Sequence, residues 1–595
     1  TFTNKAAREM RERIGGLVGR ESAKQLTIGT FHAFCARALR EHGEAIGHPA
    51  NFSICDASDQ VAAVRSVLRD LHVPEGTIHP RALQAAISLH KNRLVTAEQA
   101  ADASVDDRDH LIARAYAKYD EALRRAKCLD FDDLLLETLR LLRTDTATRS
   151  QMRERYRYLM VEEYQDTNGP QYEIVRNLAG RRKNLCVVGD DDQSIYGWRG
   201  ADVRKILEFE RDFPGCVVVR LETNYRSTRP ILDAANAVIR CNTARHEKRL
   251  RSFRGKGDEV KVVVLDDEER EARGVVADLQ KRVLARECRY KDVAILFRTA
   301  VQPRAFEAIL RERRIPYVVV GGQSFFDRKE VRDLLAFLRL IDNPDDEPSF
   351  LRVVNTPPRG VGKTTLDRLS TFATGRGEVV PRVLAHVDEI EGLTPAARDG
   401  LNRLASVLER CRSQEPGRGL VEWLRGFIEA LDYKREVERC YPDRKAREQR
   451  WNGVMEILNF AENYTKRESA PTLRGFLEIL ALTASDDPSP EEKGPRNRVT
   501  LMTLHAAKGL EYPRVYLVGI EEGILPHSRS VADDQVEEER RLMYVGITRA
   551  QRHLTITHAK QRARFGRRVE CMPSRFLFEM LDEAPPDDWR AAGAR

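Results

Sequence analysis

Two groups of carboxylates follow short apolar runs in the first third of the chain. Residues 158–161 run into Glu162 and Glu163, and residues 185–188 are followed closely by three aspartates at 190–192. Such runs are typical of buried parallel strands, apolar on both faces, whose carboxyl ends meet at one edge of an α/β sheet. One carboxylate there could hold Mg²⁺ while its neighbour orients a water for attack on phosphate. The alternative is that the acids cap strand-to-helix turns, and neither group alone decides between the two.

The composition limits the class of protein. A chain of 595 residues exceeds one ordinary core and suggests three or four domains. The net charge of +8 permits nucleic acid binding without arguing for it. Ten cysteines without a CxxC pair indicate reduced thiols in a cytoplasmic protein and argue against a zinc or iron–sulfur site. No apolar run is long enough to span a membrane and no signal peptide is expected.

The full strings around the acids carry a more specific signal. VEEYQDTN at 161–168, followed by VVGDDDQSIYGWRGA at 187–201, resembles motifs II and III of the UvrD/Rep-like superfamily 1 DNA helicases, with the Rep branch nearest. Seven motif regions occur in the order of that family. The resemblance implies an α/β fold with two RecA-like parallel-sheet domains of the P-loop NTPase type, each with a mainly helical insertion.

The pattern of strand-like and helix-like segments suggests the domain boundaries. The first RecA-like domain is expected at residues 1–52 and 143–215, around a helical insertion at 53–142. The second is expected at 216–325 and 498–580, around a helical insertion at 326–497, with a disordered tail at 581–595. Besides the two runs before the acids, strands are expected at 26–29, 216–221, 259–265, 292–298 and 316–321.

The resemblance assigns nucleotide contacts to three further strings. ETNYRS at 222–227 resembles motif IV, in which Arg226 would reach the γ-phosphate and Tyr225 would stack on the base. RVTLMTLHAAKGLEY at 498–512 resembles motif V, in which Glu511 would accept a hydrogen bond from the ribose. EEERRLMYVGITRAQ at 537–551 resembles motif VI, with Arg549 as a second arginine finger. Without the resemblance, the arginines of that string could form a solvated basic face.

In motifs II and III the resemblance implies three distinct roles. Glu162 would bind Mg²⁺, Glu163 would orient the attacking water, and Gln193 would couple the γ-phosphate to DNA. The family's usual motif II aspartate is Glu162 here. One extra methylene shifts the carboxylate, and because Mg²⁺ demands near-ideal octahedral geometry, this change could slow turnover.

The resemblance also implies a set of DNA contacts. Aromatic faces stack on any base, while hydroxyl and amide side chains at helix N-termini suit phosphates. For Phe2, the alternative to a DNA contact is packing in the core. For His32, the alternative is a helix cap or a packed ring. The implied contacts are Phe2, Thr3, Asn4, Thr30, His32, Tyr196, Trp198, Arg199, Thr503, His505, Phe565 and Ser574.

The phosphate-binding loop of the family is not matched by a convincing string. GVGKTT at 360–365 imitates its end, but the first motif position is Pro357 and no convincing strand precedes it. We interpret this stretch as a hairpin between helices that could contact a DNA phosphate. Because TFTNKAAREM at the start resembles motif Ia, we expect that an N-terminal piece with the phosphate loop is missing, and that the chain as printed is inactive without it.

The resemblance therefore implies an ATP-dependent 3′–5′ DNA helicase acting in replication or repair. ATP and Mg²⁺ would be its cofactors. Single-stranded DNA and single/double-strand junctions would be its partners, with replication or repair proteins beside them, and the protein would be a monomer or a DNA-induced dimer in the cytoplasm. Two other functions stay open, namely a non-catalytic single-stranded DNA-binding fragment and the helicase subunit of a helicase–nuclease.

Overall fold

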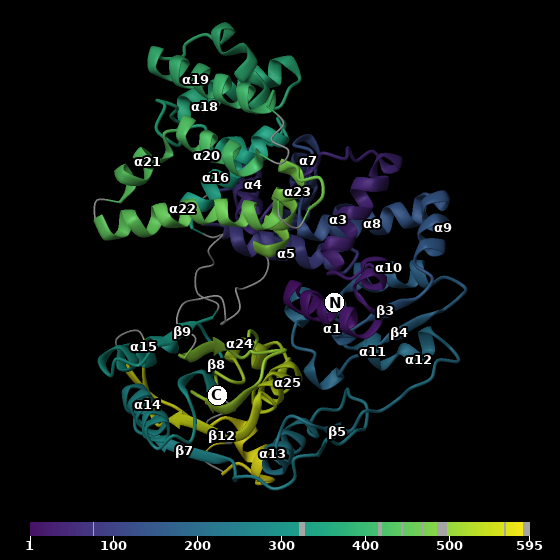
Figure 1. Ribbon diagram of the computed structural model, residues 1–595, viewed down its shortest axis with the longest axis vertical. Coiled ribbons are helices and arrows are strands. Elements are labelled where there is room, and N and C mark those ends of the chain that lie inside the picture. The colour runs from purple at the N-terminus through teal and green to yellow at the C-terminus, as the bar shows by residue number, and fades with distance from the viewer. Residues whose placement is uncertain are drawn as a thin grey trace. The chain divides into compact units, whose positions relative to one another are not determined.

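The chain folds into two compact units. The computed structural model describes residues 1–74, 76–320, 328–414, 419–441, 444–465, 468–484, 497–564, 567–586 and 589. Unit 1 comprises Thr1–Met160, Asn168–Cys186 and Gln323–Asp486, and unit 2 comprises Val161–Thr167, Val187–Gly322 and Asp487–Arg595 (Figure 1).

A six-stranded parallel sheet is the centre of unit 2. Its order is β7 (Lys261–Leu265), β12 (Ala550–Ala559), β11 (Tyr512–Leu517), β8 (Val293–Phe297), β10 (Val499–Thr503) and β9 (Tyr317–Val319). The central strand β8 reads VAILF and is buried at every position. Such an unbroken apolar run is typical of a strand that is covered on both faces.

Helices cover both faces of this sheet (Figure 1). α14 (Glu268–Leu284) and α15 (Pro303–Glu312) pack against one face, which includes Ile295 of β8. α13 (Arg229–Ile239), α25 (Val536–Ile547) and α26 (Arg575–Leu581) pack against the other face, which includes Leu296. Successive residues of one strand thus enter opposite cores, as the pleat of a strand requires.

The direction of the strands gives the sheet two chemically different edges. β8 and β10 end at the carboxyl edge, where Arg298 and His505 follow them. β11 and β12 begin at the opposite, amino edge, just after Glu511 and Arg549. α25 lies on the crossover from β11 to β12 and therefore runs from the carboxyl edge back to the amino edge. Its 12 residues span about 18 Å at 1.5 Å per residue.

Smaller elements complete unit 2. β5 and β6 form a short parallel pair, and β13 and β14 form an antiparallel hairpin. The tail was predicted to be disordered, yet the indole N–H of Trp589 donates to the carbonyl of Pro573 at 2.9 Å. These elements are α11 (Arg204–Leu207), α12 (Phe209–Asp212), β5 (Thr223–Asn224), β6 (Arg251–Ser252), α24 (Ser528–Ala532), β13 (Gln561–Arg564) and β14 (Arg567–Glu570).

Unit 1 is mainly helical and contains three apolar clusters. They are formed around α3, α8 and α10, around α4 to α7, and around α16 to α23. The helices are α1 (Asn4–Val18), α2 (Arg20–Lys24), α3 (Phe31–His42), α4 (Ala57–Asp70), α5 (Pro80–Asn92), α6 (Ala97–Asp102), α7 (Asp107–Arg125), α8 (Phe131–Thr144), α9 (Thr146–Arg155), α10 (Gly169–Ala179), α16 (Lys329–Asp342), α17 (Glu347–Val353), α18 (Lys363–Arg376), α19 (Pro395–Arg412), α20 (Leu420–Ala430), α21 (Tyr433–Cys440), α22 (Arg444–Thr465) and α23 (Leu473–Ala484). β1 (Ser53–Ile54) and β2 (Cys128–Leu129) form a short parallel pair.

The two strands before the carboxylates are less buried than predicted. β3 (Leu159–Val161) and β4 (Leu185–Val187) form a sheet of only two strands. Tyr158 and Met160 are each 80% exposed, and Val188 is 55% exposed. The prediction of strands buried on both faces is therefore wrong. Among the described residues this ribbon has no further strands, and the side chains of Tyr158 and Met160 remain uncovered.

Two further predicted strands are absent from the described structure. Residues 26–29 lead as coil into α3, and residues 216–221 are irregular, with Val217 87% exposed. β5 begins only at Thr223. Apolar runs predict strands only when a neighbouring strand supplies hydrogen-bond partners, and these two runs have no ladder within the described residues. The other predicted strands are confirmed as β7, β8 and β9, and the predicted α/β class with parallel sheets is correct.

The stretch that imitates a phosphate loop connects two helices, as interpreted from the sequence. α17 ends before it and α18 begins after it, with Gly362 as the N-terminal cap. Gly360 has a positive φ of 72°, a conformation that favours glycine. The Arg359 guanidinium fills the loop and donates to the carbonyls of Val353 and Thr356 at 2.9 and 2.8 Å.

None of the helices in the described part of the chain combines the length and apolar character needed to cross a bilayer.

Candidate nucleotide and DNA site

The loops after β3 and β4 are tied together by one glutamine. Glu163 has a positive φ of 51°, and its carboxylate accepts from the Gln165 side chain at 2.6 Å. The other end of that amide accepts from the backbone N–H of Asp190 at 3.0 Å. A Cβ on Gly189 would overlap the Gln165 oxygen, so the close approach requires glycine at this position. The two acid-bearing loops predicted from the sequence are therefore adjacent.

Lys508 is a cation beside the motif II acids that the sequence reasoning passed over. Its ammonium group pairs with Asp166, donates to the Gln193 carbonyl at 2.6 Å, and lies 3.6 Å from a Glu163 oxygen. Burial raises the pKa of Asp166 to about 6, although Lys508 opposes this shift. A lysine three residues after His505, within the motif V string, was the available signal in the sequence.

The residues around Glu162 are chemically compatible with Mg²⁺. Glu162 follows β3 and is half-buried, and Asp166 has one buried carboxylate oxygen without a hydrogen-bond partner. Within the described ranges no group of three or more His, Cys, Asp or Glu residues is arranged to hold a metal. Mg²⁺ does not require such a group, because it is usually bound by one or two carboxylates together with waters and substrate phosphates.

The three aspartates of motif III form ion pairs with side chains of unit 2. The Lys248 ammonium lies 3.0 Å from Asp190 and 3.2 Å from Asp192 and also pairs with Asp191. Arg245 binds both oxygens of Asp192, at 2.9 and 2.7 Å. Lys248 and burial act in opposite directions on Asp191, and its pKa is lowered. These acids are therefore neutralised within the protein, and Asp190 also accepts from the N–H of Asp192 as a turn cap at 3.2 Å.

Arg549 is a buried cation that forms no ion pair with an acid among the described residues. It is 1% exposed and lies just after α25. Its guanidinium donates to the carbonyls of Val545 and Leu510 at 2.9 and 3.1 Å and to the Thr548 hydroxyl at 3.1 Å. No ion pair with an acid within 4 Å is formed by this guanidinium among the described residues. Burial, and then the charge of Arg226, lowers the pKa of Arg549 to about 10.

Gln193 connects Arg549 to the acids of motif III. Its amide nitrogen donates to Asp190 at 2.6 Å, and its oxygen accepts from Arg549 at 3.4 Å. The same amide group thus contacts a carboxylate on one side and the Arg549 guanidinium on the other. The coupling role that the resemblance implies for Gln193 stays a prediction.

Arg226, Glu511 and Tyr225 lie together beside the amino edge of the sheet. Arg226 pairs with Glu511, whose other oxygen accepts from Gln551 at 2.8 Å. The pKa of Glu511 is lowered because Arg226 and Gln551 outweigh burial. Tyr225 is 65% exposed and its ring lies 5.0 Å from that of Phe253. The sequence reasoning missed Phe253. This residue directly follows β6, just as Tyr225 directly follows β5, the strand that pairs with β6.

The aromatic residues of motif III gather at the carboxyl edge. Trp198 is 59% exposed, with the Arg199 guanidinium 4.6 Å from its ring. The His505 ring lies 6.4 Å from Trp198 and 6.3 Å from Tyr196. Burial, followed by the positive charge of Arg298, lowers the pKa of His505 to about 4, so this ring is neutral at pH 7. The cluster offers an exposed aromatic face of the kind that stacks on bases.

The remaining predicted contacts of unit 2 differ in their accessibility. Thr503 is half-buried and its hydroxyl accepts from the N–H of Ala506 at 3.2 Å. Ser574 is fully buried and caps α26 by accepting from Phe576 at 3.3 Å. Its hydroxyl thus serves as a helix cap in this structure, and the DNA contact expected of Ser574 stays a prediction. Phe565 lies outside the described residues.

The motif Ia residues of unit 1 lie at the start of α1. Thr3 caps α1 by accepting from the N–H of Ala6 at 3.1 Å, and Asn4 is the first helical residue. The Phe2 ring packs 5.6 Å from Phe31. Phe2 therefore packs partly against the protein, as the core-packing alternative expected, and its side chain stays half-buried.

The motif Ib residues have a similar arrangement at the start of α3. Thr30 is 6% exposed and caps α3 by accepting from the N–H of Ala33 at 3.2 Å. His32 packs edge-on against Phe131, with ring centroids 5.5 Å apart. The packed ring that was the alternative for His32 is thus observed. Both motif Ia and motif Ib remain at helix N-termini, where unpaired N–H groups suit phosphate.

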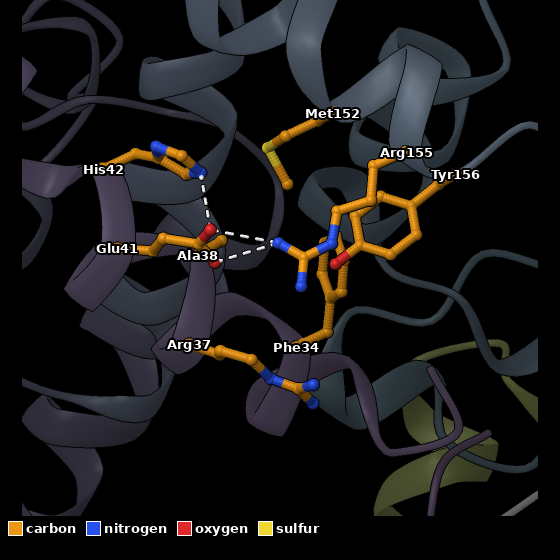
Figure 2. Close-up of a pocket in the computed structure, with 8 residues that line it drawn as sticks. All are labelled: Phe34, Arg37, Ala38, Glu41, His42, Met152, Arg155 and Tyr156. Atoms are coloured by element: carbon orange, nitrogen blue, oxygen red, sulfur yellow. Dashed lines mark hydrogen bonds and ion pairs between the residues drawn. The ribbon is translucent and has the colours of Figure 1, made fainter. Parts of the chain in front are cut away.

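A small cavity in unit 1 is unrelated to these motifs. Figure 2 shows it between α3 and α9, where Arg155 pairs with Glu41 at 3.0 Å and Phe34 meets Tyr156 edge-on. Its volume is about 10 Å³, which is room for about one water. No predicted site residue lines it, and it is too small for a nucleotide.

Comparisons with known proteins find sequence similarity over most of the chain. The family profile of the UvrD/REP helicase N-terminal domain matches residues 1–214, and that of the UvrD-like helicase C-terminal domain matches residues 219–561. The chain is 41% identical over 593 residues to the ATP-dependent DNA helicase Rep of Escherichia coli (strain K12), covering 99% of this chain and 87% of the relative. It is 40% identical over 587 residues to the ATP-dependent DNA helicase PcrA of Bacillus subtilis (strain 168), covering 98% of this chain and 79% of the relative.

These matches do not bear out one expectation. The N-terminal domain profile begins at residue 1, and the alignments include 98–99% of this chain and 79–87% of the two relatives, so they give no support to the expectation of a missing N-terminal piece. The linked expectation of inactivity has no support in these matches. The identities to Rep and PcrA differ by one percentage point and do not separate the two branches. Together, the two domain matches and the relatives show that the chain belongs to the UvrD/Rep-like family of ATP-dependent DNA helicases.

Proposed function

We propose that the chain is a 3′–5′ DNA helicase that uses ATP to move along single-stranded DNA and to unwind duplex at junctions. The observation that carries this proposal is the buried Arg549, which lacks a carboxylate partner among the described residues. A buried cation is costly unless an anion compensates it. The γ-phosphate of ATP is such an anion, and Arg549 would bind it as an arginine finger.

Arg226 would supply the second positive charge. It now pairs with Glu511, which Gln551 also holds. A phosphate would replace Glu511 as the partner of the Arg226 guanidinium. The freed Glu511 carboxylate would then accept a hydrogen bond from the ribose hydroxyl. The planar fork of arginine suits a phosphate in this exchange because it pairs with two oxygens at once. Tyr225 and Phe253 present exposed rings beside this pair for the base.

The acids of motif II would act on the water and on the metal. Glu163 is held by Gln165 and would orient the attacking water, and Glu162 would bind Mg²⁺. When bound, Mg²⁺ neutralises charge on the phosphates. Lys508 would leave Glu163 for this chemistry while keeping its pair with Asp166. Gln193 would report the state of the γ-phosphate, because it contacts Arg549 directly.

The DNA strand would bind the exposed aromatic cluster of motif III. Trp198 and Arg199 offer a stacking face and a positive charge, while neutral His505 packs behind them. Within unit 1 we propose DNA contacts by Phe2, Thr3, Asn4, Thr30 and His32, which lie at helix N-termini. Within unit 2 we propose a further DNA contact by Thr503. We also propose the two RecA-like domains and their insertions with the boundaries predicted from the sequence.

Strand displacement tests this proposal directly. A duplex with a 3′ single-stranded tail, and the same duplex with a 5′ tail, are incubated with ATP and Mg²⁺ and the protein that carries this chain. We expect unwinding of the 3′-tailed duplex only, and none with Glu163→Gln, which retains the site but lacks the carboxylate. Equal unwinding of the 5′-tailed duplex, or unwinding without ATP, would contradict the proposal.

The surroundings of the protein follow from this role. We propose a cytoplasmic protein that works as a monomer or a DNA-induced dimer, alongside replication or repair proteins. The proposal of the cytoplasm is supported by the ten cysteines, all of which are free. Sedimentation velocity with and without a dT oligonucleotide distinguishes the two assembly states, because only a DNA-induced dimer changes its mass by a full second chain.

A further inference from the structure

The first turn of α25 carries three consecutive glutamates, and their carboxylates bind different loops of unit 2. Glu537 accepts from the backbone N–H and the hydroxyl of Thr243, at 2.8 and 2.9 Å. Both carboxylate oxygens of Glu539 accept from the Arg298 guanidinium, at 2.7 and 3.1 Å. Acidic residues commonly stabilise a helix N-terminus through its dipole. These three carboxylates are instead engaged in tertiary contacts that differ from one residue to the next.

The middle carboxylate, Glu538, binds the DNA-facing turn of motif III. It accepts from the N–H of Gly197 at 3.0 Å and also from the N–H of Trp198. A Cβ on Gly197 would overlap this carboxylate, so the missing side chain is what allows the backbone to approach. The turn that presents the exposed Trp198 ring is therefore held by a side chain of α25.

The other end of the same helix leads to the nucleotide-facing arginine. Arg549 follows α25 at the amino edge and contacts Gln193 at 3.4 Å. Between Gln193 and Trp198, Ile195 is fully buried in the core that α25 shares with α13 and the sheet. The motif III segment is thus fastened at Gln193, Ile195 and Gly197 to one helix and its core.

We propose that Glu538 is a positioning residue that makes α25 a rigid connection between the nucleotide-sensing Arg549 and the DNA-stacking Trp198. This inference rests on the proposed function and adds a residue that acts through another. A change at Arg549 would move the helix end that Gln193 contacts. Because Glu538 fastens Trp198 to the opposite end, the DNA-binding turn would move with the helix. An α-helix of three turns transmits such a shift because its backbone hydrogen bonds resist bending.

Three variants separate this role from general stabilisation. Glu538→Ala removes the two contacts to the turn, whereas Glu538→Gln keeps an oxygen that accepts them. Glu537→Ala is the matched control, because it removes the same charge from the same helical turn without touching motif III. Gly197→Ala displaces the carboxylate by contact with the new methyl group and leaves Glu538 itself unchanged.

The readout is the affinity for a fluorescein-labelled dT oligonucleotide, measured by anisotropy with and without a non-hydrolysable ATP analogue and Mg²⁺. In the parent protein the analogue should change Kd. The ratio of Kd without the analogue to Kd with the analogue then measures the coupling between the two sites. In Glu538→Ala and Gly197→Ala we expect Kd to rise at least about fivefold, within the range for loss of one aromatic–base stack, and the ratio to approach 1. Glu538→Gln and Glu537→Ala should keep the ratio of the parent.

Several outcomes would overturn the inference. A Glu538→Ala protein with the ratio of the parent would show that the turn is positioned by other groups. If the ratio also approaches 1 in Glu537→Ala, the effect comes from a less stable helix and not from the contact with motif III. A parent whose ratio is itself near 1 would refute the coupling but leave DNA binding in place. A parent that does not bind the oligonucleotide would refute the proposed function as well.

Discussion

Replacing Arg549 by methionine should leave the stability of the nucleotide-free protein nearly unchanged, although this arginine is buried. A pKa of about 10 instead of 12.5 means that the folded protein disfavours the charged guanidinium by about 3 kcal/mol. Because the lowered pKa still lies far above 7, the arginine is charged at neutral pH and this cost is present in full. It is relieved only as the pH rises through about 10. Methionine removes the cost together with the hydrogen bonds, and we expect a net change within about 1 kcal/mol.

The matched control is Arg298→Met, which breaks a partly buried ion pair. Glu539 has a 5% exposed side chain and would lose the guanidinium that binds both its oxygens. Breaking such a pair typically costs about 3–5 kcal/mol, which lowers the thermal midpoint by roughly 6 °C or more. Thermal unfolding is followed by circular dichroism for both variants. If Arg549→Met lowers the midpoint as much as Arg298→Met, then Arg549 is a structural residue and the reasoning is wrong.

Three more predictions concern the site. Trp198→Ala should weaken binding of a dT oligonucleotide by about 5- to 150-fold, the range of one aromatic–base stack, and unchanged anisotropy titrations would exclude stacking there. Glu163→Gln should lower ATP hydrolysis at least about 100-fold while oligonucleotide binding persists, and a surviving rate would remove Glu163 from the chemistry. His505 has a pKa of about 4 when folded and about 6.5 when unfolded, so it destabilises the protein increasingly as the pH falls through this range. Urea denaturation of His505→Gln should show a smaller loss of stability between pH 6.5 and 4 than the parent, and equal losses would contradict the pKa.

Sequence reasoning succeeded where the signal was local. The run VAILF predicted β8 because a strand covered on both faces is apolar at every position. The start of α3 likewise depends on a local signal, the Thr30 hydroxyl, which is a preferred helix cap. The hairpin around Gly360 was also predicted, since two prolines and the absence of a preceding strand argued against a phosphate loop. In each case the relevant chemistry lies within a few residues of the chain.

Sequence reasoning failed where distant segments decide the outcome. The exposure of Met160 depends on how many strands join β3, which an apolar run cannot reveal. The aspartates at 190–192 were considered for metal or capping roles, but Arg245 and Lys248, more than 50 residues later, neutralise them. Glu538 belongs to an acidic run that reads as an ordinary helix start, and only the fold brings it to Gly197.

The central claim is that Arg549 binds the γ-phosphate of ATP in a DNA-dependent helicase. The most direct test is steady-state ATP hydrolysis with and without single-stranded DNA, by the protein that carries this chain and by its Arg549→Lys variant. We predict hydrolysis that DNA stimulates in the parent, and a loss of roughly 10³-fold or more in the variant, because lysine keeps the charge but not the planar fork. Oligonucleotide binding should persist in both. A variant that hydrolyses ATP at the parent rate, or a parent that DNA does not stimulate, would contradict the claim.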